Sequence, residues 1–366
     1  MDDINKKSRE ELLRDMKPPG AYLNSLSDFT DIIGTIKQAE NAAKELLLET
    51  SSPMNQKKPI QEHEKDKPTV EKEQLTSPQS SETQPEEETV IEKTQEELLE
   101  TLDALVGLEN IKQNVKSLIN YVKIRKLREE NELPNPPLSL HMVFAGNPGT
   151  GKTTVGRILS ELYKAIGVLS KGQLVEVDRS GLVAGFVGQT AIKTSEVVTS
   201  ALGGILFIDE AYALAPDTGT GNDFGREAIE TLLKLMEDHR NDLIVIVAGY
   251  TDPMERFINS NPGLESRFNR YLFFEDYNSE ELHDIFDLMC KKSEYILTDE
   301  AKEYAREFFK QIYENRGENF GNARHVRNFF ENIVTVHSDR VSALEGHTRD
   351  DLTMVILEDL EKATEI

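Results

Sequence analysis

The stretch of sequence that decides the fold is Gly146-Asn147-Pro148-Gly149-Thr150-Gly151-Lys152-Thr153. Its spacing is G-x-x-x-x-G-K-T, it follows the apolar run Leu140–Ala145, and a helix-compatible segment, Val155–Ile166, comes next. A strand, a glycine-rich loop and a helix in this order are the context of a phosphate-binding loop. The glycines of such a loop let successive backbone N–H groups point at one anion. The stretch therefore predicts a nucleotide site at the end of a buried strand.

The side chains of this loop have separate expected roles. Lys152 is expected to reach the β- and γ-phosphates of ATP, and the Thr153 hydroxyl is expected to ligate Mg²⁺. The helix start at Gly151 adds its partial positive charge. The candidate nucleotide-binding residues of the loop are Asn147, Pro148, Gly149, Thr150, Gly151, Lys152, Thr153 and Thr154.

A second motif, Ile205-Leu206-Phe207-Ile208-Asp209-Glu210, is an apolar run that ends in two acids. In a phosphate-loop fold Asp209 lies at a strand end, where it can hold the Mg²⁺ that bridges the phosphates. Glu210 would polarise the attacking water as a general base. Two acids after an apolar run also occur at ordinary strand ends, so it is the pairing with the phosphate loop that supports the catalytic reading.

Composition limits the partners and the compartment. The chain of 366 residues has 42 basic and 66 acidic residues, a net charge of −24. Such a surface repels phosphate backbones, so no nucleic-acid partner is expected, although a local basic pore remains compatible. The single cysteine, Cys290, excludes an intrachain disulfide and is expected to be a buried apolar side chain. Without an apolar run of about 18 residues or a signal peptide, we expect a cytoplasmic protein without membrane insertion.

Four regions follow from the distribution of apolar residues. Residues 1–50 form an N-terminal helical extension, whose second helix fits a docking or oligomer contact as well as a frayed helix. Residues 51–93 are rich in Pro, Gln, Ser, Thr, Glu and Lys, which predicts a disordered acidic linker. Residues 94–277 form an α/β nucleotide-binding domain, and residues 278–366 form a small lid domain.

The fold class is α/β, with a parallel sheet sandwiched by helices and followed by an all-helical lid. The evidence is near-continuous apolar runs that alternate with helix-compatible segments, and their absence after Tyr277. The predicted strands are Leu140–Ala145, Leu174–Val177, Ile205–Ile208, Leu243–Ala248 and Tyr271–Phe274. The predicted lid helices are Ser279–Ser293, Thr298–Asn315, Asn322–Leu344 and Arg349–Thr364.

The order of these motifs resembles AAA+ ATPases of the phosphate-loop (P-loop) NTPase fold. The likeness is closest to the CbxX/CfxQ family, which includes red-type Rubisco activases and a stage V sporulation protein. It spans about Leu98 to the C-terminus and none of residues 1–93. The segments that carry it, besides the two motifs above, are Asp103–Leu108, Gly185–Thr194, Ala211-Tyr212, Ala248–Tyr250, Ser260–Leu264, Ser266–Arg270 and Gly321–Arg324.

The resemblance implies roles for residues outside the two motifs. Val106 and Gly107 match the segment that lines the adenine pocket. Arg267 and Arg270 match arginine fingers, which stabilise the transferring phosphoryl group in a neighbouring subunit. Arg324 matches the sensor arginine of the lid, and Arg327, three residues later on the same helix face, is the alternative.

Two further positions concern hydrolysis and the central pore of such rings. Many AAA+ proteins have Asn or Thr at the end of the fourth strand, where this chain has Tyr250 with Thr251 beside it. Phe186 lies between glycines and matches the pore loop, whose aromatic side chain grips an extended polypeptide. Lys193 either supports this loop or is a solvated helix charge.

The resemblance implies an ATP- and Mg²⁺-dependent ATPase that forms a homo-oligomeric ring, a hexamer, and remodels or threads a protein substrate. A nucleotide-dependent scaffold that binds partners through residues 1–50 is the alternative. A nucleic-acid motor is permitted by the fold but disfavoured by the net charge of −24.

Overall fold

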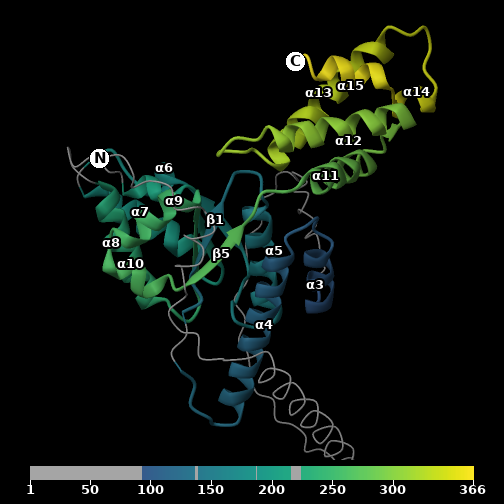
Figure 1. Cartoon of the computed structure of the whole chain (residues 1–366). Coiled ribbons are helices and arrows are strands. Elements are labelled where there is room, and N and C mark those ends of the chain that lie inside the picture. The colour runs from purple at the N-terminus through teal and green to yellow at the C-terminus, as the bar shows by residue number, and fades with distance from the viewer. Residues whose placement is uncertain (1–92, 137–138, 187, 216–223) are drawn as a thin grey trace, which may run out of the picture. The chain divides into compact units, whose positions relative to one another are not determined.

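The computed structural model describes residues 93–136, 139–186, 188–215 and 224–366. The predicted extension over residues 1–50 and nearly all of the predicted linker over residues 51–93 lie outside the described residues. The sheet with its covering helices comes first along the described chain, and the helices coloured green to yellow in Figure 1 follow it.

The central sheet has five parallel strands in the order β2-β3-β4-β1-β5. Each predicted strand is confirmed to within two residues at either end. Met142 of β1 lies opposite Ile246 of β4 and Arg270 of β5, which sets the register of these three strands. The strands are β1 (Met142–Gly146), β2 (Leu174–Val177), β3 (Ile205–Ile208), β4 (Ile244–Gly249) and β5 (Arg270–Phe274).

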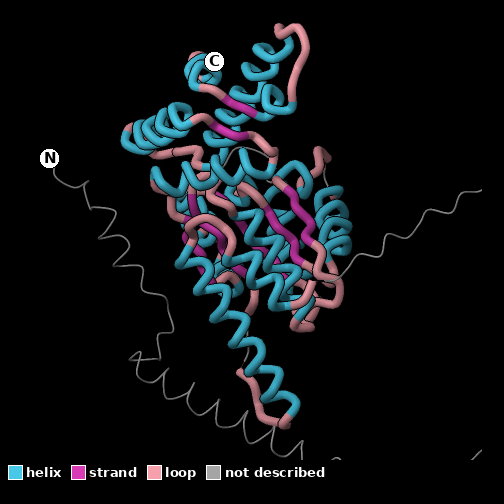
Figure 2. The backbone as a smooth tube through the Cα atoms, turned by 90° about the vertical axis from the view of Figure 1, so that its right-hand side faces the viewer, coloured by secondary structure: helices cyan, strands magenta, loops and turns pink. Residues whose placement is uncertain are grey.

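Helices cover both faces of the sheet, because alternate strand residues are buried on opposite sides. Phe144 and Phe207 pack with α3, α4 and α5, whereas Val143 and Leu206 pack with α7, α8 and α9. Figure 2 shows the strands between these two layers. The helices are α3 (Gln95–Asp103), α4 (Glu109–Glu130), α5 (Lys152–Ala165), α6 (Arg179–Leu182), α7 (Gln189–Ala201), η1 (Ala211–Leu214), α8 (Phe224–Asp238), α9 (Thr251–Asn259) and α10 (Pro262–Arg267).

The lid has a hydrophobic core of its own. Phe286, Phe309 and Phe329 are buried at its centre with ring centroids 5.5 to 5.8 Å apart. Asn278 and Glu281 form a capping box that starts the first lid helix directly after the last strand of the sheet. The lid helices are α11 (Ser279–Lys292), α12 (Asp299–Glu314), α13 (Ala323–Ser342), α14 (Arg349–Thr353) and α15 (Leu357–Ala363).

The prediction of one continuous helix over Arg349–Thr364 is wrong. The chain leaves α14 as strand β7 (Met354–Val355), which pairs in parallel with β6 (Ile296–Leu297), and then begins α15. The Asp359 carboxylate caps α15 by accepting from the Ile356 N–H at 3.0 Å, so this N–H is not available to continue α14. The lid is therefore helical except for this pair of strands, rather than all-helical.

Candidate functional site

A cavity of about 600 Å³ lies at the carboxyl ends of β1, β3 and β4 and is closed on one side by the lid. It brings together most of the residues that the sequence singles out. Those that line it are Val106, Pro148, Gly149, Gly151, Lys152, Thr153, Thr154, Asp209, Glu210, Tyr250, Arg324 and Arg327.

The Lys152 side chain is hydrogen-bonded to the backbone of its own phosphate loop. Lys152 Nζ donates hydrogen bonds to the carbonyl oxygens of Gly146 at 2.9 Å and Asn147 at 2.8 Å. Burial lowers the pKa of Lys152 to about 8, partly offset by the negative charge of Asp209. Thr150, which is fully buried, donates to the same Asn147 carbonyl at 2.7 Å and stabilises the turn from inside. The lysine is thus held at the loop, where an anion would attract it.

The acid pair lies at the end of β3, as predicted. The Glu210 N–H donates to Asp209 Oδ1 at 3.0 Å, and Glu210 takes the left-handed conformation with φ of 48°. This turn leaves the Glu210 side chain exposed and the Asp209 side chain half-buried. The two carboxylates therefore have different surroundings, which suits a metal ligand and a base.

A third carboxylate beside the loop is not apparent from the sequence motifs. Thr153 Oγ1 donates to Glu176 Oε1 of β2 at 3.3 Å. In the described part of the chain, no group of three or more His, Cys, Asp or Glu side chains is placed to hold a metal ion. Mg²⁺ is usually bound through one or two carboxylates together with substrate phosphates, so Thr153 and Asp209 fit such a site.

Two tyrosines lie above the ends of β3 and β4. The rings of Tyr212 and Tyr250 have centroids 6.3 Å apart, and a Cβ added to Gly249 would meet the Tyr212 ring. Burial, followed by the negative charge of Glu210, raises the pKa of Tyr212 to about 12. Tyr212 therefore stays a neutral hydrogen-bond donor beside the proposed base. The sequence motifs do not assign it this position.

The apolar end of the cavity is built from both domains. Val106, Leu108 and Leu105 face Ile285 and Leu288 of α11. Gly107, with φ of 60°, lies next to this wall and shapes the turn before α4. The lid also adds cations to the lining: Arg324 and Arg327 of α13 both line the cavity, as does Lys292 of α11, which the sequence motifs do not single out.

Arg270 begins β5 at the end of the strand opposite to this cavity, and Arg267 ends α10 just before it. Arg270 is opposite Met142 whereas Phe274 is opposite Gly146, four residues or about 13 Å further along the strand. Arg267 is held by Glu237 at 3.4 Å, and among the described residues its buried Nε has no hydrogen-bond partner. Arg270 donates to the Ser139 carbonyl at 3.1 Å and lies over the Tyr121 ring. Neither arginine reaches the phosphate loop of its own chain.

Phe186 is 72% exposed in the loop before α7. Lys193 Nζ donates to the carbonyl oxygens of Ser180 at 2.6 Å and Val183 at 3.2 Å, so it supports this loop rather than lying in solvent. The buried Thr190 accepts from the Ala184 N–H at 3.1 Å. The segment below the exposed ring is therefore well anchored.

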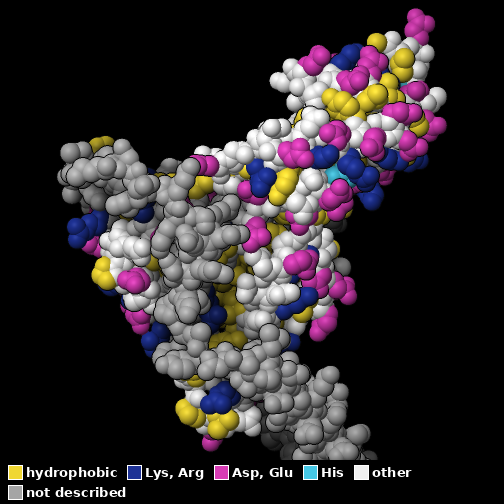
Figure 3. Space-filling view, viewed as in Figure 1, with side chains coloured by type: hydrophobic (Ala, Val, Ile, Leu, Met, Phe, Trp, Pro, Cys, Tyr) yellow, Lys and Arg dark blue, Asp and Glu magenta, His cyan; other side chains and the backbone are white. Residues whose placement is uncertain are grey.

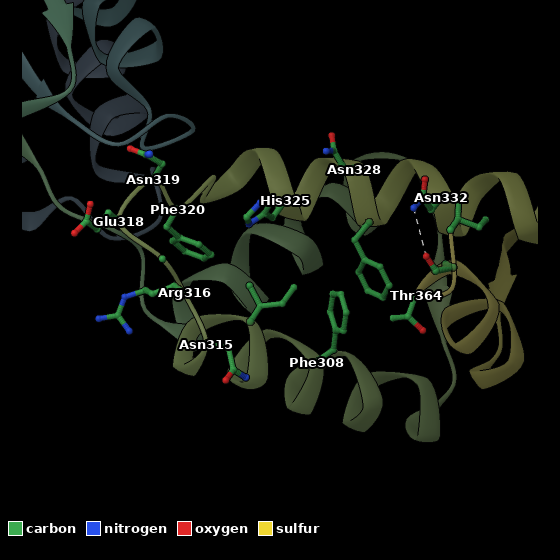
Figure 4. A pocket seen from close by; sticks show the side chains of 15 residues that line it. Phe308, Asn315, Arg316, Glu318, Asn319, Phe320, His325, Asn328, Asn332 and Thr364 are labelled. Atoms are coloured by element: carbon green, nitrogen blue, oxygen red, sulfur yellow. Dashed lines mark hydrogen bonds between the residues drawn. The ribbon is translucent and has the colours of Figure 1, made fainter. Parts of the chain in front are cut away.

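A second cavity, of about 690 Å³, lies within the lid and away from the phosphate loop. Figure 3 shows hydrophobic side chains gathered on the lid near α12 and α13. In Figure 4 the Phe308 ring points into the cavity and Phe320 borders it, whereas the Asn328 side chain points away. Its lining lacks the loop and acid pair that phosphate chemistry requires.

Family models match both parts of the described chain. Residues 142–276 match the ATPase family associated with various cellular activities (AAA), and residues 278–366 match the AAA lid domain. The chain therefore belongs to the AAA ATPases, and its activity is ATP hydrolysis. No helix of the described residues is both long and apolar enough to cross a membrane.

Within this class the chain falls with the CbxX and CfxQ proteins. It is 40% identical over 265 residues to stage V sporulation protein K of Bacillus subtilis, covering 72% of this chain and 82% of the relative. A CfxQ homolog of Galdieria sulphuraria is 42% identical, with coverage of 74% and 88%. The chloroplastic ribulose bisphosphate carboxylase/oxygenase activase of Cyanidioschyzon merolae is 40% identical, with coverage of 75% and 94%. The predicted family is confirmed.

Proposed function

We propose that this ATPase forms a homo-oligomeric ring, a hexamer, that remodels a protein substrate and threads it through a central pore. The observation that carries the proposal is the separation of Arg270 from the phosphate loop of its own chain along β5, with Arg267 at the end of α10 just before this strand. The finger role requires each arginine to meet the γ-phosphate held by a neighbour. AAA proteins typically form oligomers, which agrees with such a shared site.

The residues of the cavity divide the chemistry between them. ATP bound with Mg²⁺ supplies the transferable phosphoryl group. Lys152 stabilises charge on the phosphates, and Thr153 and Asp209 hold the metal. Glu210 takes the proton of the attacking water, and Tyr250 or Thr251 orients that water. Arg324 or Arg327 couples the bound nucleotide to the position of the lid.

The surface beside the fingers supports a contact between subunits. Tyr121, Ile124 and Leu127 of α4 are each at least 37% exposed, at a spacing of three residues. Figure 3 shows hydrophobic side chains at the far end of this helix. The stripe adjoins Arg270 through its contact with Tyr121, 5.8 Å from guanidinium to ring centroid. An apolar helix face beside the fingers is suited to pack on a neighbouring chain.

The exposed Phe186 supports the threading step. An aromatic side chain on an anchored loop can hold a polypeptide through apolar contact that ignores sequence. Replacing Phe186 with Ala should leave ATP turnover largely unchanged, because the residue lies outside the ATP cavity. Loss of substrate remodelling is the expected result, and undiminished remodelling would remove the pore role.

The shared site is tested by mixing two inactive variants. Glu210→Gln and Arg267→Ala should each lower kcat about 100-fold or more. If the finger acts on a neighbour, equal mixtures should recover about a quarter of wild-type turnover, since about one in four random interfaces joins an intact base to an intact finger. Arg256→Ala, at an exposed position on α9, is the matched control and should retain activity. Mixtures as inactive as their parents would contradict the shared site.

A nucleotide-dependent scaffold is the second candidate. The three relatives align with only 72 to 75% of this chain, which leaves room for a partner-binding extension over residues 1–50. Removal of residues 1–92 that abolishes partner recruitment and spares ATP turnover would favour the scaffold. A cytoplasmic location and the lack of a nucleic-acid partner remain predictions.

A further inference from the structure

The phosphate loop is hydrogen-bonded to the hinge, residues 275–278, which connects β5 to the first lid helix. Asn147 Nδ2 donates to both carboxylate oxygens of Asp276, at 2.9 and 3.1 Å. Asp276 follows β5 and lies two residues before Asn278, which caps the first lid helix. The loop side chain that precedes Pro148 is thus fixed by the hinge rather than by the loop itself.

The lid reaches the same carboxylate through Asn322. This residue is fully buried, has φ of 48°, and donates from Nδ2 to Asp276 Oδ1 at 2.8 Å. The same amide lies 3.3 Å from the Pro148 carbonyl, while its Oδ1 accepts from the Tyr277 N–H at 2.8 Å. One buried side chain therefore contacts the loop, the hinge and the lid together.

Backbone contacts complete the junction. The Ala323 N–H, at the start of α13, donates to the Gly149 carbonyl at 3.2 Å. A Cβ at Gly149 would overlap the Gly321 carbonyl, so the loop and the lid meet at van der Waals distance. Three successive loop residues, 147 to 149, are thus bonded to the hinge or to the lid.

The negative charge of Asp276 disfavours the binding of a negatively charged nucleotide. Burial lowers the pKa of Lys152, and the negative charge of Asp276 is one of those that partly oppose this lowering. The same charge must repel a phosphate anion there. Two amide groups donate to Asp276, and an ionised carboxylate accepts both without presenting a competing donor. The acid therefore fits a structural junction better than direct ligand binding.

We propose that Asp276 is a positioning residue that, with Asn322, locks the phosphate loop to the lid, so that nucleotide binding and lid position are coupled. A lid movement must either carry residues 147 to 149 with it or break these hydrogen bonds. By linkage, whatever the nucleotide does to the lid, the lid does to nucleotide affinity by the same factor.

Asp276→Asn tests the junction, because charge and positioning predict opposite results. Binding of ADP that carries a fluorescent methylanthraniloyl group should weaken about tenfold or more, since the new amide opposes at least one donor with a donor. If Asp276 acted only through its charge, the same variant would bind more tightly. Glu275→Gln removes the same charge at an exposed neighbouring position and should change affinity little. Unchanged or tighter binding by Asp276→Asn would overturn the proposal.

Rescue separates positioning from general damage. In the double variant Asn147→Asp/Asp276→Asn, the new carboxylate at 147 can accept from the new amide at 276, whose oxygen can still accept from Asn322. We expect affinity to recover to within about threefold of wild type, as a coupled pair should. An additive loss in the double variant would contradict the pairing.

Hydrogen exchange in the nucleotide-free protein tests the lid contact without relying on activity. Asn322→Gly retains a residue that tolerates positive φ and removes the amide. The Ala323 amide and those of the phosphate loop should exchange about tenfold faster in this variant, while amides within α12 stay protected. Equal exchange rates in wild type and Asn322→Gly would refute the proposed lock. In the binding titrations, failure of the wild-type protein to bind the labelled ADP would instead contradict the assigned ATP site.

Discussion

The Lys152 side chain is largely buried, and its ammonium group donates to two carbonyl oxygens of the phosphate loop. Its pKa is lowered to about 8 in the nucleotide-free protein, chiefly by burial. A bound phosphate raises that pKa again, because it favours the charged ammonium. Below about pH 8 the lysine is already charged, whereas above it binding must take up a proton.

The expected result is a nucleotide affinity that is nearly constant below about pH 8 and falls by up to about tenfold per pH unit above it. Titrations with methylanthraniloyl-ADP at several pH values measure the affinity. Calorimetry in buffers of different ionisation enthalpy counts the protons taken up. Alkaline affinity equal to that at neutral pH, without proton uptake, would contradict the lowered pKa.

At the scale of elements, one ion pair holds α15 on α13. The Asp359 side chain is fully buried and accepts from Arg340 Nε at 2.8 Å and Nη2 at 2.9 Å. Asp359→Asn should destabilise the lid by about 3–5 kcal/mol, because it leaves a guanidinium without its bidentate partner. Glu307→Gln, in a half-exposed pair with Lys310 at 3.7 Å, should cost less than about 1 kcal/mol.

Chemical denaturation followed by lid hydrogen exchange measures the two effects of these substitutions. Equal losses of stability in Asp359→Asn and Glu307→Gln would show that the buried pair contributes no more than a surface pair.

The strands and the loop chemistry are predictable because their signals are local. A strand buried on both faces needs a continuous apolar run, and the phosphate loop and the acid pair are each contiguous in sequence. The break at Met354–Val355 is not predictable in this way, since it depends on pairing with Ile296–Leu297, far back in the chain. The same reason hides Glu176 and Asp276, which reach the site from separate elements and whose sequence neighbours carry no pattern that marks them. Tyr212 lies close to the acid pair in sequence, but its packing beside Tyr250 depends on the end of β4.

For the molecule as a whole, the net charge of −24 makes a prediction about partners. Duplex DNA should leave ATP turnover unchanged at physiological salt, because the negative surface repels the phosphate backbone. Turnover is measured with and without DNA over a range of salt concentrations. Stimulation that declines steeply as salt rises would point to a basic pore and revive a nucleic-acid motor.

The pairing of β6 with β7 also has a mechanical meaning. The strands β6 and β7 lie near the two ends of the lid sequence, one just after α11 and the other just before α15. The pairing of β6 with β7 links the first part of the lid sequence to its last helix, which limits the relative movement of the helices between them. We expect a rotation that starts between β5 and α11 to reach the later lid helices with little bending between them.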